Sequence, residues 1–263
     1  MNEAELLFTE VLQCDRPSLY RDSRRALTPT QSSFIASALR RRMRGEPIQY
    51  ILGEADFMGL EFKVTPDCLI PRPETEILVE ALVQCVDART RKGTGVITVL
   101  DVGTGSGCIA VSLARSRPEA LVTATDISAR AIEVARKNAL RHGVAVSLVE
   151  GDLFAGVEGR KFDIIVSNPP YVSSGEIDTL QREIRYEPRV ALDGGADGVS
   201  FYRRMIDRAP RYLAGGGAML MEIGSGQRRA IEALIEQSGT LRITEIKRDY
   251  SGIERVVGVV GSG

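Results

Sequence analysis

Near-continuous apolar strands that alternate with helices constrain the fold of this chain most strongly. The segments ITVLDV (97–102) and FDIIVS (162–167) have little polar character, so they need cover on both faces of a sheet. We expect strands at 96–102, 121–126, 146–150, 162–167, 218–223, 242–247 and 255–260, and helices at 109–116, 129–142, 199–213 and 227–237. This alternation is typical of a doubly wound α/β domain with a mostly parallel sheet.

The last two predicted strands are joined by a short connection. Residues 249–254 separate them and leave no room for a helix. A parallel pair needs a longer crossover, so these two strands should pair antiparallel. The expected sheet is therefore seven-stranded and mostly parallel, with the last strand antiparallel and the last two strands together closing one edge.

The first quarter of the chain has a different pattern. Apolar residues recur at helical spacing in 3–13 and 32–43, and Thr28-Pro29-Thr30 is typical of a helix start. Extended segments around Gly59 then predict a hairpin, and a proline-rich stretch leads into a helix at about 74–88. We expect a small helical domain at 1–48, a β-hairpin linker at 49–68 and the α/β domain at 69–263.

Charge and cysteine spacing argue against several functional classes. The net charge of -1 provides no overall basic field for nucleic acid or an anionic membrane. The N-terminus lacks a basic leader, and no apolar run approaches the roughly 20 residues of a membrane span. Four widely spaced cysteines favour reduced thiols in a cytoplasmic protein. With His142 as the single histidine, a histidine-based metal site is poorly supported, and we expect no metal.

A cationic run, RRRMR (40–44), ends the second predicted helix. Positive charge in a last helical turn suits the helix dipole, so a solvated helix end explains it. Contact with ribosomal RNA or with an acidic protein partner is the other interpretation, and the sequence leaves both open.

A glycine-rich loop, DVGTGSG (101–107), joins the first strand of the α/β domain to a helix. Glycines permit a tight turn, and the helix start offers unpaired N–H donors to a ligand. The spacing is G-x-G-x-G, and Cys108 stands where a dinucleotide fingerprint needs glycine. This pattern favours a nucleoside without a pyrophosphate. The candidate cofactor-binding residues here are Gly103, Thr104, Gly105, Ser106 and Gly107.

Two further acids end the next two strands. Asp126, followed by Ile127, lies where an acid can accept both ribose hydroxyls, although it could instead cap the helix near Ser128. Asp152, followed by Leu153, lies where an adenine amine could be bound, although a turn aspartate is the simpler role. Because the carboxyl ends of parallel strands share one edge, we expect these residues beside the glycine loop.

The fourth strand ends in Asn168-Pro169-Pro170-Tyr171. The two prolines make a rigid extended corner with unpaired carbonyls. An amide nitrogen is a weak nucleophile that must be oriented, and the Asn168 side-chain oxygen and the Pro169 carbonyl can each accept one of its N–H groups. Tyr171 can offer a flat face to a planar amide or base. The candidate catalytic residues are Asn168, Pro169 and Tyr171, and no strong base is required.

The glycine loop and the Asn-Pro-Pro-Tyr corner together resemble class I methyltransferases that act on planar nitrogens of adenine, guanine or glutamine. Flanking stretches resemble one family among these, the peptide chain release factor glutamine methyltransferases. Those stretches are LIPRPETE (69–76), RYEP (185–188), ALDGGADG (191–198), RDY (248–250) with RVV (255–257), and GEADF (53–57). The resemblance runs from about residue 45 to the C-terminus.

This resemblance implies N5-methylation of the glutamine in the Gly-Gly-Gln loop of release factors. The methyl donor would be S-adenosylmethionine, leaving S-adenosylhomocysteine, with no membrane or direct nucleic-acid partner. It implies that residues 168–171 bind the glutamine and that Phe57 walls the acceptor pocket. An Arg185–Glu187 ion pair would order the acceptor loop, and the helical domain could recognise the partner. Leu153 replaces an aromatic found beside the adenine in some members, so stacking is weaker or is supplied by Phe154.

Two alternatives remain, one a different enzyme and the other a binding protein. An adenine-N6 or guanine-N2 nucleic-acid methyltransferase usually carries a target-recognition domain or a basic groove, for which this chain has little room. A binding protein that has lost catalysis need not retain an intact acceptor corner. A cofactor-turnover assay separates this last class from the enzymes.

Overall fold

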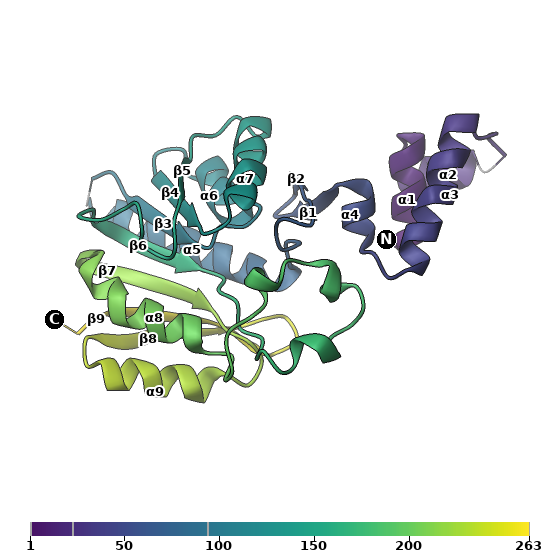
Figure 1. The fold of residues 1–263 in the computed structure, drawn as a ribbon. Coiled ribbons are helices and arrows are strands. Elements are labelled where there is room, and N and C mark those ends of the chain that lie inside the picture. Colours follow the sequence, from purple (N-terminus) through teal and green to yellow (C-terminus); the bar gives the residue numbers. More distant parts are fainter. Residues whose placement is uncertain (1, 23, 94, 263) are drawn as a thin grey trace.

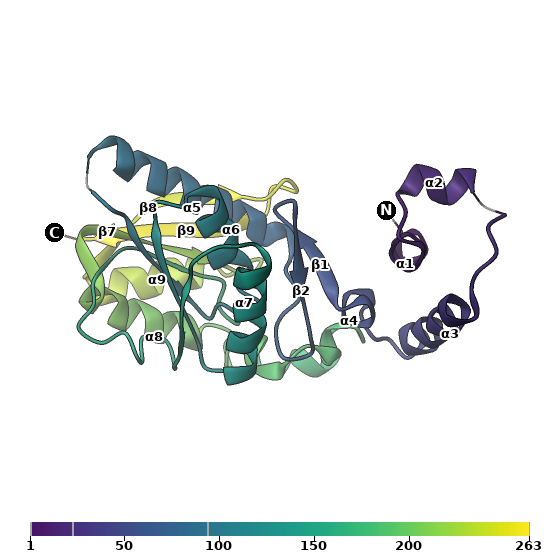
Figure 2. The ribbon, with the colours of Figure 1, turned by 90° about the horizontal axis from the view of Figure 1, so that it is seen from above.

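The computed structural model describes residues 2–22, 24–93 and 95–262. The N-terminal part consists of α1 (Glu3–Leu12), α2 (Arg16–Arg21), α3 (Pro29–Met43) and α4 (Ile48–Leu52), followed by the hairpin strands β1 (Glu54–Phe57) and β2 (Leu60–Lys63). In two perpendicular views, α1 to α3 lie to one side of the large sheet, and α4 with the hairpin lies between them and the sheet (Figures 1 and 2).

Capping boxes set the starts of two N-terminal helices. The side chain of Asn2 accepts the N–H of Glu5 at the start of α1, and the Glu5 carboxylate accepts the N–H of Asn2 in return. Thr28 and Gln31 make the same exchange at the start of α3. Each exchange satisfies two donors that a helix start leaves unpaired. The helices enclose a small apolar core of Leu7, Ile35, Ala38, Ile48 and Ile51.

Two short helices differ from the sequence prediction. The periodicity does not predict α2, which is only six residues long and is capped by Asp15, whose side chain accepts the N–H of Ser18 at 2.9 Å. Residues 49–52, predicted as extended, belong to α4, and Gly53 ends that helix in the left-handed region with a φ of 85°. The predicted hairpin is present but begins at Glu54.

The large sheet contains β3 (Thr98–Val102), β4 (Leu121–Asp126), β5 (Ser147–Glu150), β6 (Phe162–Ser167), β7 (Leu213–Glu222), β8 (Leu241–Arg248) and β9 (Glu254–Gly261). Its order is β5-β4-β3-β6-β7-β9-β8. β9 pairs antiparallel with both β7 and β8, whereas the other pairs are parallel. The prediction of a mostly parallel seven-stranded sheet with an antiparallel last strand is confirmed.

Helices cover both faces of this sheet, as the apolar strands require. They are α5 (Pro73–Arg91), α6 (Cys108–Ser116), α7 (Ala129–Arg141), α8 (Ser200–Arg208) and α9 (Arg228–Ser238). One buried core joins the sheet to α5 and α6 through Leu78, Leu82 and Leu113. A second core joins the sheet to α8 and α9 through Met205 and Ile235. The two separate cores make the domain doubly wound.

One strand boundary differs from the prediction. β7 begins at Leu213, where the sequence predicts a helix to 213 and a strand only from 218. The glycines at 215–217 obscure the start of the strand, and α8 in fact ends at Arg208. β7 thus extends further toward its N-terminal end than its apolar residues alone indicate.

The connection between β6 and α8 is long and carries the Asn-Pro-Pro-Tyr corner. Three short 3-10 helices interrupt it, at Ile177–Thr179, Ile184–Tyr186 and Arg189–Ala191. In Figure 1 this acceptor segment (168–199) extends toward the N-terminal helices. Arg42 of α3 pairs with Glu183 at 2.7 Å, so the two parts are in direct contact.

The structure also describes the cysteines and the lengths of the helices. All four cysteines are free thiols; Cys68 and Cys108 are buried, and Cys14 and Cys85 are half-buried. Among the described residues, no helix has the length and apolar character needed to cross a bilayer.

Candidate active site

A cavity of about 230 Å³ lies at the carboxyl ends of the parallel strands β3 to β6. It brings together most of the residues predicted from the strand ends. Those that line it are Gly103, Thr104, Gly105, Ser106, Asp126, Ile127, Asp152, Leu153, Asn168 and Pro170. A ligand site at this edge is what a doubly wound sheet provides, because the loops there splay apart.

The glycine loop needs its glycines for two different reasons. Gly105 has a φ of 56°, in the left-handed region that favours glycine, and a Cβ there would meet open space. Gly107 caps α6 with a φ of 81°, and a Cβ on it would lie 3.0 Å from the Cβ of Ala135 in α7. Gly105 therefore leaves the cavity side of the loop open, whereas Gly107 allows α6 and α7 to pack closely. Gly107 is not among the described residues that line the cavity.

Both carboxylate oxygens of Asp126 accept backbone N–H groups, one of them from the glycine loop. Oδ2 accepts the N–H of Gly105 at 2.8 Å, and Oδ1 accepts the N–H of Ser128 at 2.9 Å. Burial raises the pKa of this carboxyl, whereas the two backbone N–H groups lower it. The cap of α7 is Ser128, whose hydroxyl accepts the N–H of Ala131 at 3.2 Å. Carboxylate oxygens each have a second lone pair, so Asp126 can still accept hydrogen bonds from a ligand.

A second acid is buried at the base of the loop. Asp101 ends β3, and its Oδ2 accepts the hydroxyl proton of Thr104 at 2.6 Å. Among the described residues its Oδ1 has no hydrogen-bond partner. Burial, with a smaller contribution from the nearby Asp126, raises the pKa of Asp101 to about 7, although the hydrogen bond from Thr104 lowers it.

Asp152 and Leu153 both line the cavity, but their surroundings differ. Asp152 forms an ion pair with Arg204 of α8, which also lines the cavity. Leu153 is buried with a φ of 58°. Phe154, predicted as a substitute stacking partner, instead stacks on Tyr212 with centroids 4.3 Å apart in the second core. The prediction for Phe154 is wrong because its ring points into the sheet–helix core.

Asn168 lies at the cavity with its side-chain amide fixed from one side. Its Nδ2 donates to the hydroxyl of Thr75, in the first turn of α5, at 3.0 Å. The Thr75 side chain is buried and also lines the cavity. This hydrogen bond directs the NH₂ group toward α5, so Oδ1 is the acceptor that remains for a ligand.

The rest of the corner is held from the opposite side. Pro169 is buried, and Pro170 lines the cavity. The Gln227 side-chain NH₂ donates to the Tyr171 carbonyl at 2.9 Å and to the Gly198 carbonyl at 3.1 Å. Burial raises the pKa of the half-buried Tyr171. Pro169 and Tyr171 are not among the described lining residues, although they adjoin two that are.

The predicted Arg185–Glu187 ion pair is wrong. Arg185 is exposed on a 3-10 helix, where it donates to the carbonyls of Asp178 at 2.6 Å and Leu180 at 3.3 Å. Glu187 turns inward and pairs with Arg72 instead. The 3-10 helix rotates these two side chains to different sides of the segment, which a sequence separation of two residues does not reveal.

Phe57 is also placed differently from the prediction. It is 1% exposed and packs edge-on against Phe62, with ring centroids 6.0 Å apart. It belongs to the core beneath the hairpin and is not among the described residues that line the cavity. A four-residue strand with alternating burial directs Phe57 inward toward that core.

Several cavity residues were not predicted as site residues. Arg72 and Thr75 lie in the LIPRPETE stretch. That stretch carries part of the family resemblance, which was the one signal that these two residues contribute to the site. Phe201 and Arg204 line the cavity from α8, and no motif in the sequence points to them. Asn138 supports the loop from behind by donating to the Ser106 carbonyl at 2.8 Å.

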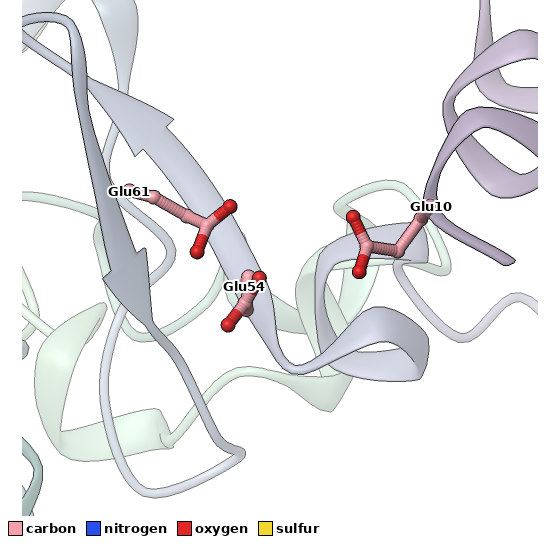
Figure 3. Close-up of side chains that lie close together, drawn as sticks. All are labelled: Glu10, Glu54 and Glu61. Atoms are coloured by element: carbon pink, nitrogen blue, oxygen red, sulfur yellow. The ribbon is translucent and has the colours of Figure 1, made fainter. Parts of the chain in front are cut away.

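A cluster of acids lies outside this cavity. Glu10 of α1 and Glu54 and Glu61 of the hairpin have carboxylate oxygens within 4.8 Å of one another (Figure 3). Arg141 of α7 forms ion pairs with both Glu54 and Glu61. Because this guanidinium offsets part of their charge, we interpret the cluster as an ion-pair network and assign it no ligand.

Comparison with known proteins identifies the family. A relative from Geobacter sulfurreducens, a release factor glutamine methyltransferase, is 43% identical over 257 residues, which is 97% of this chain and 88% of the relative. The chain belongs to the release factor glutamine methyltransferase family. A second member, from Bordetella pertussis, is 42% identical over 97% of this chain and 93% of its own length. The methyltransferase small domain model matches residues 74–196, and the PrmC N-terminal domain model matches residues 1–53.

Solved structures support the fold of this family member. A methyltransferase from Pyrococcus furiosus aligns with a TM-score of 0.53 at 19% identity, covering 89% of this chain and 98% of its own. The ribosomal protein L11 methylase from Lactobacillus delbrueckii aligns with a TM-score of 0.52 at 23% identity, covering 76% of this chain and 83% of its own. Identities this low show a shared methyltransferase fold and say nothing about the substrate.

Proposed function

We propose that this protein methylates the side-chain N5 of the glutamine in the Gly-Gly-Gln loop of peptide chain release factors. S-adenosylmethionine is the methyl donor, and S-adenosylhomocysteine is the product. The observation that carries this proposal is Asn168, whose amide is fixed by Thr75 and offers Oδ1 to the cavity. Family membership supports both the donor and the acceptor class.

The chemistry of the cavity fits the donor. The open glycine turn at Gly105 gives close access to backbone, and Asp126 retains acceptor capacity for ribose hydroxyls. Leu153 and Ile127 supply apolar surface for the adenine, without an aromatic ring. We assign Gly103 to Gly107, Asp126, Ile127, Asp152, Leu153 and Asn168 to cofactor binding, with Gly107 acting through the packing of α6. When bound, the donor supplies an electrophilic methyl group on a positively charged sulfur.

The acceptor corner orients the glutamine amide. Asn168 Oδ1 and the Pro169 carbonyl each accept one N–H of that amide, which fixes the nitrogen and directs its lone pair toward the methyl group. Correct alignment of two reacting groups accounts for a large share of the barrier reduction in such reactions. The amide proton becomes acidic after the methyl group arrives and passes to water, so no side chain acts as a strong base. Pro170 and Tyr171 shape the remaining walls.

This assignment gives each part of the chain a separate role. Residues 69–263 form the catalytic domain, residues 49–68 the hairpin linker and residues 1–48 a helical domain that contacts the release factor. Release factors act in the cytoplasm, and the free thiols are consistent with that compartment. Arg185 and Glu187 contribute to the acceptor segment separately. Arg185 bonds to carbonyls within the segment, and Glu187 pairs with Arg72.

The direct test uses a purified release factor and S-adenosylmethionine carrying a labelled methyl group. We expect the label on the glutamine of the Gly-Gly-Gln peptide, and none on a release factor whose glutamine is replaced by alanine. Duplex DNA and ribosomal RNA serve as competing acceptors in parallel. Efficient transfer to either nucleic acid, with none to the protein, would overturn the proposal.

A further inference from the structure

Glu222 is a buried acid next to the acceptor corner with no role in the reaction described above. It ends β7 and is 1% exposed, and its Oε2 has no partner among the described residues. Glu222 follows Met221, which pairs with Ser167 of β6 directly before Asn168. The hydroxyl of Thr75, which receives the Asn168 Nδ2 group, lowers the pKa of Glu222 through a hydrogen bond. Burying an incompletely paired carboxyl costs stability, so its position calls for a reason.

We infer that Glu222 is a positioning residue for methyl transfer, which acts through the Thr75 hydroxyl to fix the orientation of the Asn168 side-chain amide. This inference rests on the proposed function. Thr75 and Asn168 line the cavity, whereas Glu222 is not among the described lining residues. Glu222 therefore does not contact the reacting groups.

The number of protons that each group holds sets the direction of these hydrogen bonds. A threonine hydroxyl has one proton to donate. An ionised Glu222 has none, so the Thr75 proton must be donated to Glu222. The Thr75 oxygen then serves as an acceptor, and Asn168 can satisfy it only with Nδ2, as the structure has it. The order of donors thus directs Oδ1 of Asn168 to the cavity, where the glutamine amide needs an acceptor.

Protonation of Glu222 would remove this constraint. A protonated carboxyl can donate to Thr75, whose own proton is then available to the Asn168 Oδ1, so the amide can turn and present NH₂ to the cavity. That orientation places a donor where the substrate also has a donor. Burial raises the pKa of Glu222 to about 7, so both states are accessible near neutral pH.

Charged groups from the neighbouring elements shift the pKa of Glu222. Arg255 of β9 and Arg72, just before α5, lower its pKa, whereas Glu74 of α5 raises it. The hydroxyl of Tyr202 in α8 donates to the Glu222 backbone carbonyl at 2.7 Å. Tyr171 of the acceptor corner lies close enough that Glu222 raises its pKa. Both tyrosines stay protonated near neutral pH, so Glu222 is the group among these that titrates there.

The test compares Thr75→Val with Thr75→Ser, in the wild-type and in the Asn168→Ala backgrounds. We expect Thr75→Val to lower kcat about 10-fold or more, since misplaced reacting groups cost up to about 10²-fold. Thr75→Ser, which keeps the hydroxyl, should recover most of the rate. In the Asn168→Ala background Thr75→Val should cost nothing further, because a residue acting through Asn168 has nothing left to position.

A second variant tests the titration. Wild-type kcat should fall as the pH drops below about 7, and Glu222→Gln, which cannot ionise, should flatten that part of the profile. Binding of S-adenosylmethionine, measured by calorimetry, should be within a few-fold of wild type in the Thr75 and Glu222 variants. An equal loss from Thr75→Val in both backgrounds, or an unaltered pH profile in Glu222→Gln, would overturn the inference. Failure of the wild-type enzyme to methylate any release factor would instead count against the proposed function.

Discussion

Arg72 and Glu187 form an ion pair that joins the start of α5 to the acceptor segment. Glu187 is buried, and it also accepts the N–H of Ile70 at 3.3 Å. Burial raises the pKa of Glu187, whereas Arg72 lowers it. The segment that carries the acceptor corner is thus anchored to the same stretch of chain that carries Thr75.

Replacing Arg72 with alanine should destabilise the acceptor segment. Removing one member of a buried pair costs about 3–5 kcal/mol, and the half-exposed Arg72 places this case at the lower end. Thermal unfolding and limited proteolysis between residues 172 and 198 should both report the change. Arg185→Ala is the matched control, since its exposed side chain should alter stability by less than about 0.5 kcal/mol. Equal effects of the two substitutions would contradict the assignment of Glu187 to Arg72.

This ion pair also shows where prediction from sequence reaches its limit. The strands of the sheet and the strand-end site follow from apolar periodicity and from the rule that parallel strands place their carboxyl ends together. Gly103 to Ser106, Asp126 and Asn168 were therefore predictable as neighbours. Arg72 and Glu187 are 115 residues apart, and no local pattern records which charge meets which.

Side-chain direction in irregular segments was equally hard to predict. Phe57 was assigned to the site and Phe154 was one of two alternatives for stacking on the adenine, and both are core residues in the structure. An aromatic ring next to a site motif has the same sequence signature whether it faces the ligand or the core. A shift of one residue in a short strand or loop decides whether the ring faces the ligand or the core, and tertiary packing sets that shift.

Asp126 provides the next test. Asp126→Ala removes the acceptor of the Gly105 N–H along with the proposed ribose contacts. An unpaired buried group costs about 1–3 kcal/mol, so affinity for S-adenosylmethionine should fall roughly 5- to 150-fold. Calorimetric titration measures this, and Asp126→Asn, which keeps one acceptor oxygen, should lose less. A folded Asp126→Ala protein with unchanged affinity would mean that the ribose is bound elsewhere.

Asp101 predicts a specific dependence of stability on pH. Its pKa is about 7 in the folded protein, above its value of 3.8 in the unfolded chain, so the folded state favours the protonated carboxyl. The resulting stabilisation is complete below about pH 3.8 and is lost as the pH rises through 7. The difference in Tm between wild type and Asp101→Asn should therefore change between pH 5 and pH 8. A difference that stays constant across this range would show that Asp101 does not titrate there.

The exposed face of α3 tests the role of the helical domain. Leu39 and Met43 are one turn apart, 51% and 82% exposed, and thus form an apolar patch beside the cationic end of the helix. Replacing both with glutamate should raise KM for the release factor on the order of 10-fold, a typical loss for interface anchors. Binding of S-adenosylmethionine should not change. Leu140→Glu, at a 75% exposed position on α7, is the control. An equal rise in KM for that control would remove α3 from recognition.

The most direct measurement is methylation of a purified Gly-Gly-Gln release factor by wild-type protein and by Asn168→Ala, followed by peptide mass spectrometry. We expect one added methyl group on that glutamine with wild type, and a rate at least roughly 10²-fold lower with Asn168→Ala, the scale of lost positioning. Donor binding should survive in part, because the glycine loop and Asp126 are intact. Near-normal methylation by Asn168→Ala, or no methyl group on the glutamine with wild type, would contradict the assignment of this corner as the site of transfer.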